Sequence, residues 1–393
     1  MQATGKPDRS EASTDLALVG HPFASIGRGE DLRCAIRALE AAGLRFTVRD
    51  AYGGNPEHDP VLRQELAECI RPELSPGTNV FFLNGDEVEQ ALAHLGSSRR
   101  QGSYDIVYPQ WELSIYPPEW ARQLDLFDEI WAPSRFVLGA LKDAVSKPVV
   151  HMPLPIEPRL EAFLPRRYFG LPESSYLFLF FFDFSSYIER KNPLAVLRAF
   201  EKACEECPEA DTALVVKTAR PWQSDVFERE LRQLKGRIQA SLQAERIILL
   251  DRVLPDYEIK NLMRACDCFV SLHRSEGFGR GMAEAMWLGK PVVATGYSGN
   301  LDFMTEDNSR LVPYTLIEVQ EGQYPYAGGQ VWAEPDVDQA AERMSELLKD
   351  GDSGRRLGQV ASRHVRTHLS HRAFGLRFGT RLDEIHASTR RVT

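Results

Sequence analysis

Short apolar runs alternate with amphipathic stretches along most of the chain. The first apolar run covers residues 16–20, and it is followed by a glycine turn, a helical pattern at 31–42 and a second run at 46–48. Strands separated by helices form parallel sheets with right-handed crossovers, so this unit predicts an α/β fold. The same pattern predicts further strands at residues 79–83, 105–108, 129–132 and 149–150.

A proline-rich and charged stretch at residues 153–172 indicates a change of unit, and the alternation then restarts. This second series is too long to share one compact sheet with the first. It therefore predicts two Rossmann-like, doubly wound domains facing a central cleft. The predicted parts are a disordered tail at 1–15, a first domain at 16–155, a second at 156–369, and a C-terminal helix at 370–393 suited to cross back to the first domain. Residues 318–330 read as an insertion loop.

Charge and composition narrow the class of protein. With 47 basic and 56 acidic side chains, the net charge of −9 argues against a nucleic-acid partner. No run approaches the ~20 apolar residues that cross a bilayer, so membrane association is expected to be at most peripheral. The N-terminus lacks the apolar core of a signal peptide and the six cysteines are scattered, which favours a cytoplasmic protein with reduced thiols.

A glycine-rich loop stands out between the apolar run 268–272 and the predicted helix 282–288. Gly277, Gly279 and Gly281 leave the backbone N–H groups uncovered at a helix N-terminus, which is a site for an anion. Two acids, Glu276 and Glu284, lie in the same stretch. Glycine-rich loops alone are weak signals, and the acidic pair is what makes a solvated turn the poorer interpretation.

The motifs around this loop resemble those of a known family. Glu276-Gly-Phe-Gly279, Glu284-Ala-Met286, residues 289–294 and Ser298-Gly-Asn300 resemble the signature of the retaining family 4 glycosyltransferases of GT-B fold. Segments at 256–259, 265–267, 332–336, 27–30, 111–113 and 129–134 also resemble it, so the likeness covers nearly the whole chain. It implies transfer of a hexose from a UDP- or GDP-linked sugar to a hydroxyl of a saccharide, lipid-linked or small-molecule acceptor.

Sugar transfer leaves negative charge on the distal phosphate, so the site must hold hydrogen-bond donors and cations that stabilise this charge. Arg190 and Lys191 follow the predicted strand 177–182, and Lys217 ends the next one. The resemblance implies that Lys191 contacts the diphosphate, with Arg190 standing in for an arginine that the family carries several residues earlier. It also implies that Glu284 binds the ribose, and that Glu276 holds the donor sugar and stabilises positive charge at its anomeric carbon.

Other candidates carry open alternatives. For donor binding they are Gly277, Phe278 and Gly279 in the loop, Val253 beside the nucleobase, and Asn300, which either bonds the donor or shapes a turn. Gly27 and Gly29 either admit the diphosphate or form a tight turn. On the acceptor side, Trp111 either stacks on a sugar or belongs to the core, and Glu112 is either a base or a salt-bridge partner. His273 and His21 are core histidines or catalysts.

No Asp-x-Asp metal motif follows a strand, and the resemblance implies a metal-independent enzyme without a cofactor. Two other functions share these features. One is a GT-B epimerase acting on a nucleotide sugar, and the other is a non-catalytic partner that binds a nucleotide sugar. Phosphorylases share the fold but are usually far longer than 393 residues.

Overall fold

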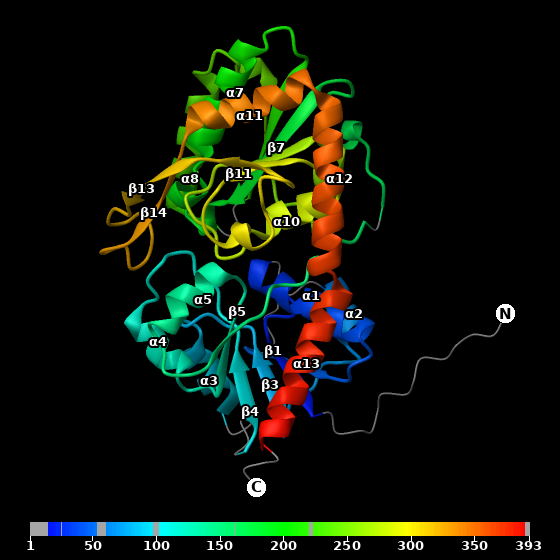
Figure 1. Cartoon of the computed structure of the whole chain (residues 1–393), viewed down its shortest axis with the longest axis vertical. Coiled ribbons are helices and arrows are strands. Elements are labelled where there is room, and N and C mark those ends of the chain that lie inside the picture. The colour runs from blue at the N-terminus through cyan, green and yellow to red at the C-terminus, as the bar shows by residue number, and fades with distance from the viewer. Residues whose placement is uncertain are drawn as a thin grey trace, which may run out of the picture.

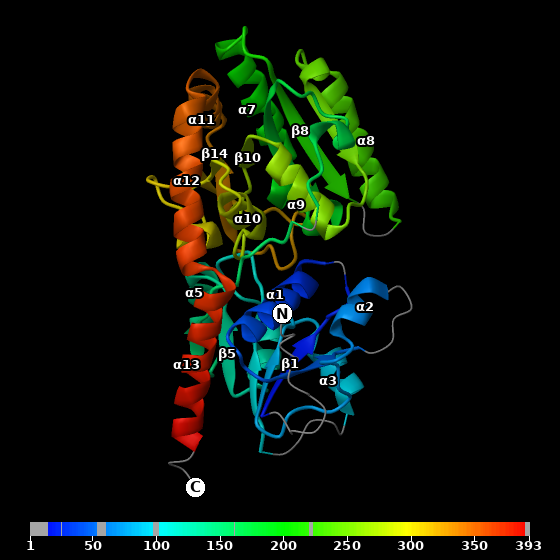
Figure 2. The same cartoon turned by 90° about the vertical axis from the view of Figure 1, so that its right-hand side faces the viewer.

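Two parallel sheets, each flanked by helices, are stacked one above the other in this computed structural model (Figures 1 and 2). The structure describes residues 15–24, 26–52, 60–96, 102–160, 162–219 and 223–389. The predicted disordered tail falls almost wholly on residues 1–14, outside the described ranges. The two doubly wound sheets confirm the predicted α/β, GT-B-like architecture.

The first sheet has the strand order β2-β1-β3-β4-β5-β6, with all pairs parallel. Its strands are β1 (Leu16–Gly20), β2 (Thr47–Asp50), β3 (Thr78–Phe81), β4 (Tyr104–Val107), β5 (Glu129–Ala132) and β6 (Val149–His151). The helices of this half are α1 (Gly27–Ala41), α2 (Pro60–Leu66), α3 (Val88–Leu95), α4 (Pro118–Leu124) and α5 (Arg135–Lys142).

The second sheet has the order β12-β11-β10-β7-β8-β9, also parallel throughout. Its strands are β7 (Tyr176–Asp183), β8 (Thr212–Ala219), β9 (Ile247–Asp251), β10 (Cys268–Ser271), β11 (Val292–Thr295) and β12 (Arg310–Val312). The helices are α6 (Ile188–Lys191), α7 (Pro193–Glu206), α8 (Asp225–Gln239), α9 (Asp256–Ala265), α10 (Arg280–Trp287), α11 (Val337–Lys349), α12 (Gly351–His368) and α13 (His371–Thr389). An antiparallel pair, β13 (Tyr314–Glu318) and β14 (Val331–Pro335), stands apart from both sheets.

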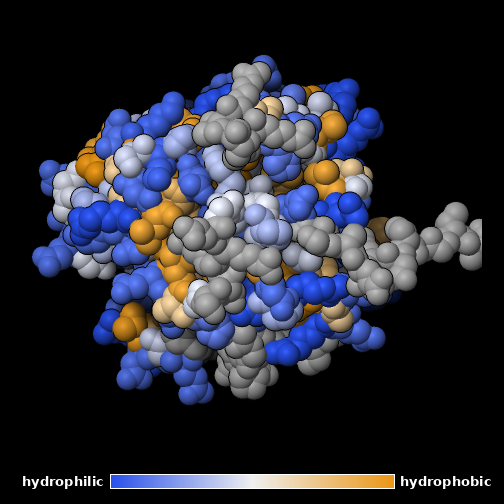
Figure 3. All heavy atoms as spheres, turned by 90° about the horizontal axis from the view of Figure 1, so that it is seen from below, coloured by the Kyte–Doolittle hydropathy of each residue, from blue (hydrophilic) through white to orange (hydrophobic). Residues whose placement is uncertain are grey.

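The central strands are buried because helices cover both faces of each sheet, whereas the edge strands β6 and β9 are half-buried. β1, β3, β5, β10 and β11 are buried along their whole length, as expected for parallel strands in a sheet that is covered on both faces. Viewed from below, the outer surface is mainly hydrophilic and its hydrophobic residues lie in small patches (Figure 3). Among the described helices, none combines the length and apolar content that crossing a bilayer requires.

The last two helices run end to end along one edge of the molecule, α12 beside the second sheet and α13 beside the first (Figures 1 and 2). α13 packs against α1, and its Phe378 ring lies 4.9 Å from the Trp131 ring of β5. Arg381 adds an ion pair with the buried Glu129. β1 and α13 therefore belong to the same domain.

One predicted boundary was wrong in a way that bears on the site. The sequence pattern starts a helix at residue 31, whereas α1 begins at Gly27 and contains both Gly27 and Gly29. A side chain at Gly29 would lie 2.2 Å from the carbonyl oxygen of Ala24, so this glycine allows the helix to pack on the turn before it. The glycine turn is thus the first turn of the helix.

Candidate functional site

The site lies where the strand order of the second sheet reverses. β7 and β10 are neighbours there although β8 and β9 intervene in sequence, and such switch points open a crevice at the carboxyl ends of the strands. The segment after β7 carries Arg190 and Lys191, and the loop after β10 carries Glu276. The topology therefore brings these three residues together across 85 positions of sequence.

Glu276 lies between two cations, and 13% of its side chain is exposed. Its carboxylate pairs with the Lys191 ammonium and lies 3.3 Å from the Arg190 guanidinium. Burial raises the pKa of Glu276, but Lys191 and Arg190 outweigh burial and lower that pKa to about 2. The Ser298 hydroxyl accepts a 2.8 Å hydrogen bond from the Glu276 backbone N–H. Glu276 is therefore a fixed carboxylate at neutral pH.

Glu284 belongs to a second ion cluster, in α10. Its carboxylate lies 2.5 Å from the Lys260 ammonium of α9 and 3.7 Å from the Arg280 guanidinium, and the residue is 3% exposed. Burial lowers the pKa of Lys260, but Glu284 and Asp256 reverse the effect and the pKa is raised overall. Glu284 is therefore not a solvated acid of a helix end but half of a buried ion pair.

The glycine loop between the two acids has the geometry of an anion site. Gly279 adopts φ +91° and caps α10. The N–H groups of residues 277–281 therefore take no part in the backbone hydrogen bonds of the helix. Within the described ranges, no hydrogen bond uses these N–H groups. Together with the N-terminus of α10, they can receive a phosphate.

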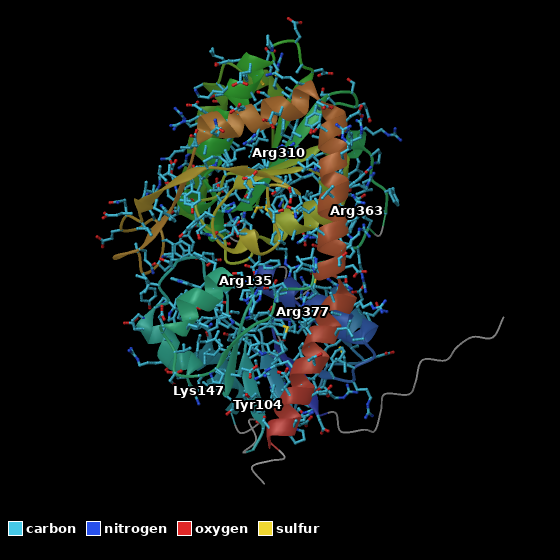
Figure 4. The ribbon with its side chains drawn as sticks, in the orientation of Figure 1. Tyr104, Arg135, Lys147, Arg310, Arg363 and Arg377 are labelled. Atoms are coloured by element: carbon cyan, nitrogen blue, oxygen red, sulfur yellow. The ribbon has the colours of Figure 1, made fainter. Side chains whose placement is uncertain are left out.

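Contacts between the two domains surround this loop. A side chain at Gly277 would meet the Trp111 carbonyl at 2.7 Å, and the Gly277 carbonyl accepts a 2.5 Å hydrogen bond from the Ser134 hydroxyl. The Asp302 carboxylate accepts the Arg135 backbone N–H at 3.1 Å and a His151 ring nitrogen lies 2.6 Å from it. Figure 4 labels Arg135 at this junction.

Several predicted residues have structural partners. Trp111 is 2% exposed, donates its ring N–H to the Ile115 carbonyl and packs edge-on against Tyr116 and Trp120, so its placement matches the core alternative. Phe278 is buried against Phe303. The Asn300 side chain donates to the Thr295 carbonyl and lies 3.2 Å from a His273 ring nitrogen.

The remaining candidates differ in exposure. Lys217 is buried at the end of β8, and burial lowers its pKa. Val253 is exposed in the loop after β9, while Gly27 has open space around it. His273 is fully buried and burial lowers its pKa, which fits a core histidine. Glu112 accepts a 2.5 Å hydrogen bond from the Tyr324 hydroxyl.

Sequence reasoning missed four residues of the site: Lys260, Arg280, Asp31 and Tyr324. Arg280 stands four residues before Glu284, a spacing that predicts a pair on one helix face. Tertiary contacts place the other three residues in the site, and no local sequence motif had indicated them. Among the described residues, no group of three or more His, Cys, Asp or Glu side chains is arranged as metal ligands.

Comparisons with known proteins agree with this geometry. Residues 170–364 match the sequence model of the family described as glycosyl transferases group 1. A trehalose synthase from Pyrococcus horikoshii is 24% identical over 176 residues, which are 44% of this chain and 36% of that protein. The match thus spans about a third of the relative's length.

Solved structures match nearly the whole chain at low identity. The Anabaena protein HepE, solved with UDP and glucose, has a TM-score of 0.69 at 13% identity, covering 94% of this chain and 99% of its own. A Thermosynechococcus elongatus sucrose-phosphate synthase gives 0.65 at 16% identity, covering 95% and 99%. A Burkholderia multivorans trehalose 6-phosphate synthase gives 0.64 at 13%, covering 97% and 98%. The chain therefore has the GT-B fold, and its residues 170–364 are similar to the glycosyl transferases group 1 family.

Proposed function

We propose that this protein is a retaining, family 4 hexosyltransferase that uses a UDP- or GDP-linked sugar. The observation that carries the proposal is the placement of Glu276, Lys191 and Arg190 at the switch point of the second sheet, beside a loop of free N–H groups. To bind a nucleotide sugar, a site needs cationic side chains for the diphosphate and a carboxylate that accepts hydrogen bonds from the sugar hydroxyls. This site offers both within one cluster.

In the proposed reaction, the bond between the anomeric carbon and the distal phosphate oxygen breaks. A bond to the acceptor oxygen forms, and the proton of the acceptor hydroxyl passes to the departing diphosphate. Lys191, Arg190 and the N–H groups of the loop stabilise the charge on that diphosphate. When the diphosphate draws the two cations toward itself, Glu276 becomes free to accept donor-sugar hydroxyls and to stabilise positive charge at the anomeric carbon.

Glu284 is proposed to bind the ribose hydroxyls, with Lys260 holding its carboxylate in place. Lys217, Val253 and Asn300 remain proposed donor contacts, and the charge on the diphosphate is proposed to be met by side chains without a metal. Loss of transfer after chelation, followed by recovery with magnesium or manganese, contradicts the metal-free form of the proposal.

The first test is a thermal-shift series with UDP, GDP and ADP, followed by an assay of nucleotide release from the matching nucleotide sugar. A bound diphosphate stabilises the fold by mass action, by about 2.7 kcal/mol at 100 times Kd. Glu284→Gln is expected to weaken diphosphate binding at least roughly tenfold, which is about 1.4 kcal/mol. Glu276→Gln is expected to lower turnover more than affinity.

The control is Glu306→Gln, which changes an exposed acid outside the cluster and should leave both quantities unchanged. If no nucleoside diphosphate shifts the melting temperature of the wild type, the proposed function is wrong. If both cluster variants behave as the control does, the donor site lies elsewhere.

A further inference from the structure

The loop between β13 and β14 leaves the second domain and docks on the first. Figure 1 shows this hairpin on the flank of the molecule, level with the junction of the domains. Tyr324 and Gln330 of the loop are buried there. The Gln330 side-chain amide donates to the Ile115 carbonyl at 2.6 Å and accepts the Ile115 N–H at 3.0 Å. The predicted insertion loop is therefore an ordered bridge between the domains.

This bridge is connected directly to the charged cluster of the site. The Tyr324 hydroxyl donates to the Glu112 carboxylate at 2.5 Å, and the Arg190 guanidinium lies 3.9 Å from Glu112 and 3.3 Å from Glu276. At the base of the hairpin, Glu334 accepts a 2.6 Å hydrogen bond from Arg274, two residues before Glu276. The hairpin therefore contacts the charged cluster twice, through Tyr324 in its loop and through Glu334 at its base.

The first sheet presents acids toward this region at its own switch point, between β1 and β3. Glu87 follows β3, and its carboxylate lies 2.8 Å from a ring nitrogen of His21, which follows β1. Asp86 stands beside it. Burial raises the pKa of Asp86, and the neighbouring carboxylates Glu87 and Glu112 raise it further. Asp86, Glu87 and Glu112 thus place three carboxylates on the first-domain side, where His21 lies beside Glu87 and Arg190 beside Glu112.

Two exposed tyrosines border the same region. Tyr187 is 41% exposed with its ring 4.7 Å from the Tyr324 ring, and Tyr326 is 44% exposed with its ring 5.2 Å from the Trp120 ring. Both have positive φ, 62° and 53°, a conformation uncommon for residues with side chains and maintained only where the surroundings fix it. The fold thus holds two flat apolar rings, each with a polar tip: Tyr187 beside Glu112 and Asp86, and Tyr326 on the Trp120 ring.

This combination matches the chemistry of a sugar ring. The apolar face of a saccharide can lie on an aromatic ring, and its hydroxyls can donate to ionised carboxylates, which only accept. A phosphate on the acceptor would instead lie beside the carboxylates of Glu87 and Glu112, and like charges repel each other. The surroundings therefore select against an anionic acceptor.

We infer that the β13–β14 hairpin completes the acceptor site and that this site takes an uncharged saccharide rather than a sugar phosphate. In this inference, which rests on the proposed function, Tyr187 and Tyr326 contact the acceptor ring. Tyr324 is a positioning residue that orients Glu112 toward the acceptor hydroxyl. The acceptor site is then built from both domains.

The acceptor class is tested with the full chain and whichever of UDP-glucose or GDP-mannose binds. Glucose, N-acetylglucosamine, maltose and cellobiose are compared with glucose 6-phosphate as stimulants of nucleotide release. At least one uncharged sugar is expected to raise release more than roughly tenfold over water. Preference for the phosphate, or no stimulation by any uncharged sugar while hydrolysis of the donor proceeds, overturns the inference but not the proposed function. Absence of donor binding overturns the proposed function itself.

The hairpin is tested with Tyr187→Ala, Tyr326→Ala and Tyr324→Phe, against the control Leu316→Ser on the exposed face of β13. The two alanine variants are expected to raise the acceptor KM roughly tenfold, and Tyr324→Phe to lower the kcat of transfer. The Leu316→Ser control should keep the wild-type acceptor KM and kcat, the wild-type Kd for the nucleoside diphosphate and the wild-type rate of donor hydrolysis. Acceptor KM and kcat equal to the control's would show that the hairpin only joins the domains.

Discussion

At the scale of single residues, the neighbours decide what an acid can do. Glu276 and Glu284 look alike in sequence, eight positions apart in one motif. In the fold, Glu276 faces the domain junction with Lys191 and Arg190, while Glu284 is enclosed with Lys260 and Arg280. Their proposed roles differ because their partners come from different strands and helices.

His371 gives a pH-dependent prediction at this scale. It opens α13 and is buried beside Glu157, with Arg37, Arg159 and Glu30 also acting on it. Burial lowers the pKa of His371 from 6.5 to about 4, and Glu157 only partly offsets this. Because the unfolded chain binds the proton more tightly, this contribution to stability is complete above pH ~6.5 and is lost as the pH falls toward 4.

The melting temperature is therefore expected to drop between pH 7 and pH 5, and to drop less in His371→Asn. Thermal unfolding followed by circular dichroism measures both drops. The exposed His94→Asn serves as the control and should show the full wild-type drop. An equal drop in all three proteins would contradict the assignment to His371.

At the scale of elements, helices α10 and α12 meet where a glycine permits close approach. A side chain at Gly358 of α12 would lie 2.0 Å from the Gly289 carbonyl oxygen, in the turn that ends α10. That turn also receives the Ser362 hydroxyl, which donates to the Trp287 carbonyl at 2.9 Å. The contact fixes the far end of the helix whose N-terminus faces the glycine loop.

Gly358→Ala is therefore expected to destabilise the second domain by about 1–3 kcal/mol, the usual cost of overpacking. Gly236→Ala in α8, where a side chain meets nothing within 4 Å, should instead stabilise by about 0.4–1 kcal/mol. Urea unfolding measures both free energies. A Gly358→Ala protein as stable as the wild type would mean that the helices separate at little cost.

At the scale of the whole molecule, buried ion pairs hold the two domains together. Arg280 of α10 donates to the Asp31 carboxylate of α1 at 3.1 Å, and Arg28 lies 2.9 Å from the same carboxylate. Glu284 sits in the same charged network, so its environment depends on how the domains are placed. Ligand binding and domain position are thereby coupled.

Asp31→Asn removes the carboxylate shared by the buried Arg28 and by Arg280, which keeps Glu284 as a partner, and breaking a buried ion pair typically costs about 3–5 kcal/mol. We expect a larger radius of gyration by small-angle X-ray scattering, because the domains separate, and a lower melting temperature. Asp352→Asn removes an exposed ion pair on α12 and should change neither quantity. Unchanged scattering from Asp31→Asn would show that the domain position does not depend on this pair.

The sequence alone determined the order of strands β1 to β11, the presence of two α/β units, and the glycine loop with its two acids, but it did not predict β12, β13 and β14. These follow from local signals: apolar runs, helix periodicity, and glycines before a helix. Helix ends were less well predicted, as at Gly27, because the chain before α1 packs on Gly29 and no local rule encodes that contact.

Only the tertiary structure decided which charges meet. Glu276 forms an ion pair with Lys191 because β7 and β10 lie side by side. Glu112 accepts a hydrogen bond from Tyr324 because the hairpin crosses between the domains. No local pattern of the sequence shows whether Trp111 is exposed or buried. It is a core residue because the rings of Tyr116 and Trp120 and the Tyr324 ring of the hairpin pack around it. Contacts between side chains that are far apart in sequence depend on how the whole chain packs. Periodicity and motif spacing describe only neighbouring residues and therefore do not predict such contacts.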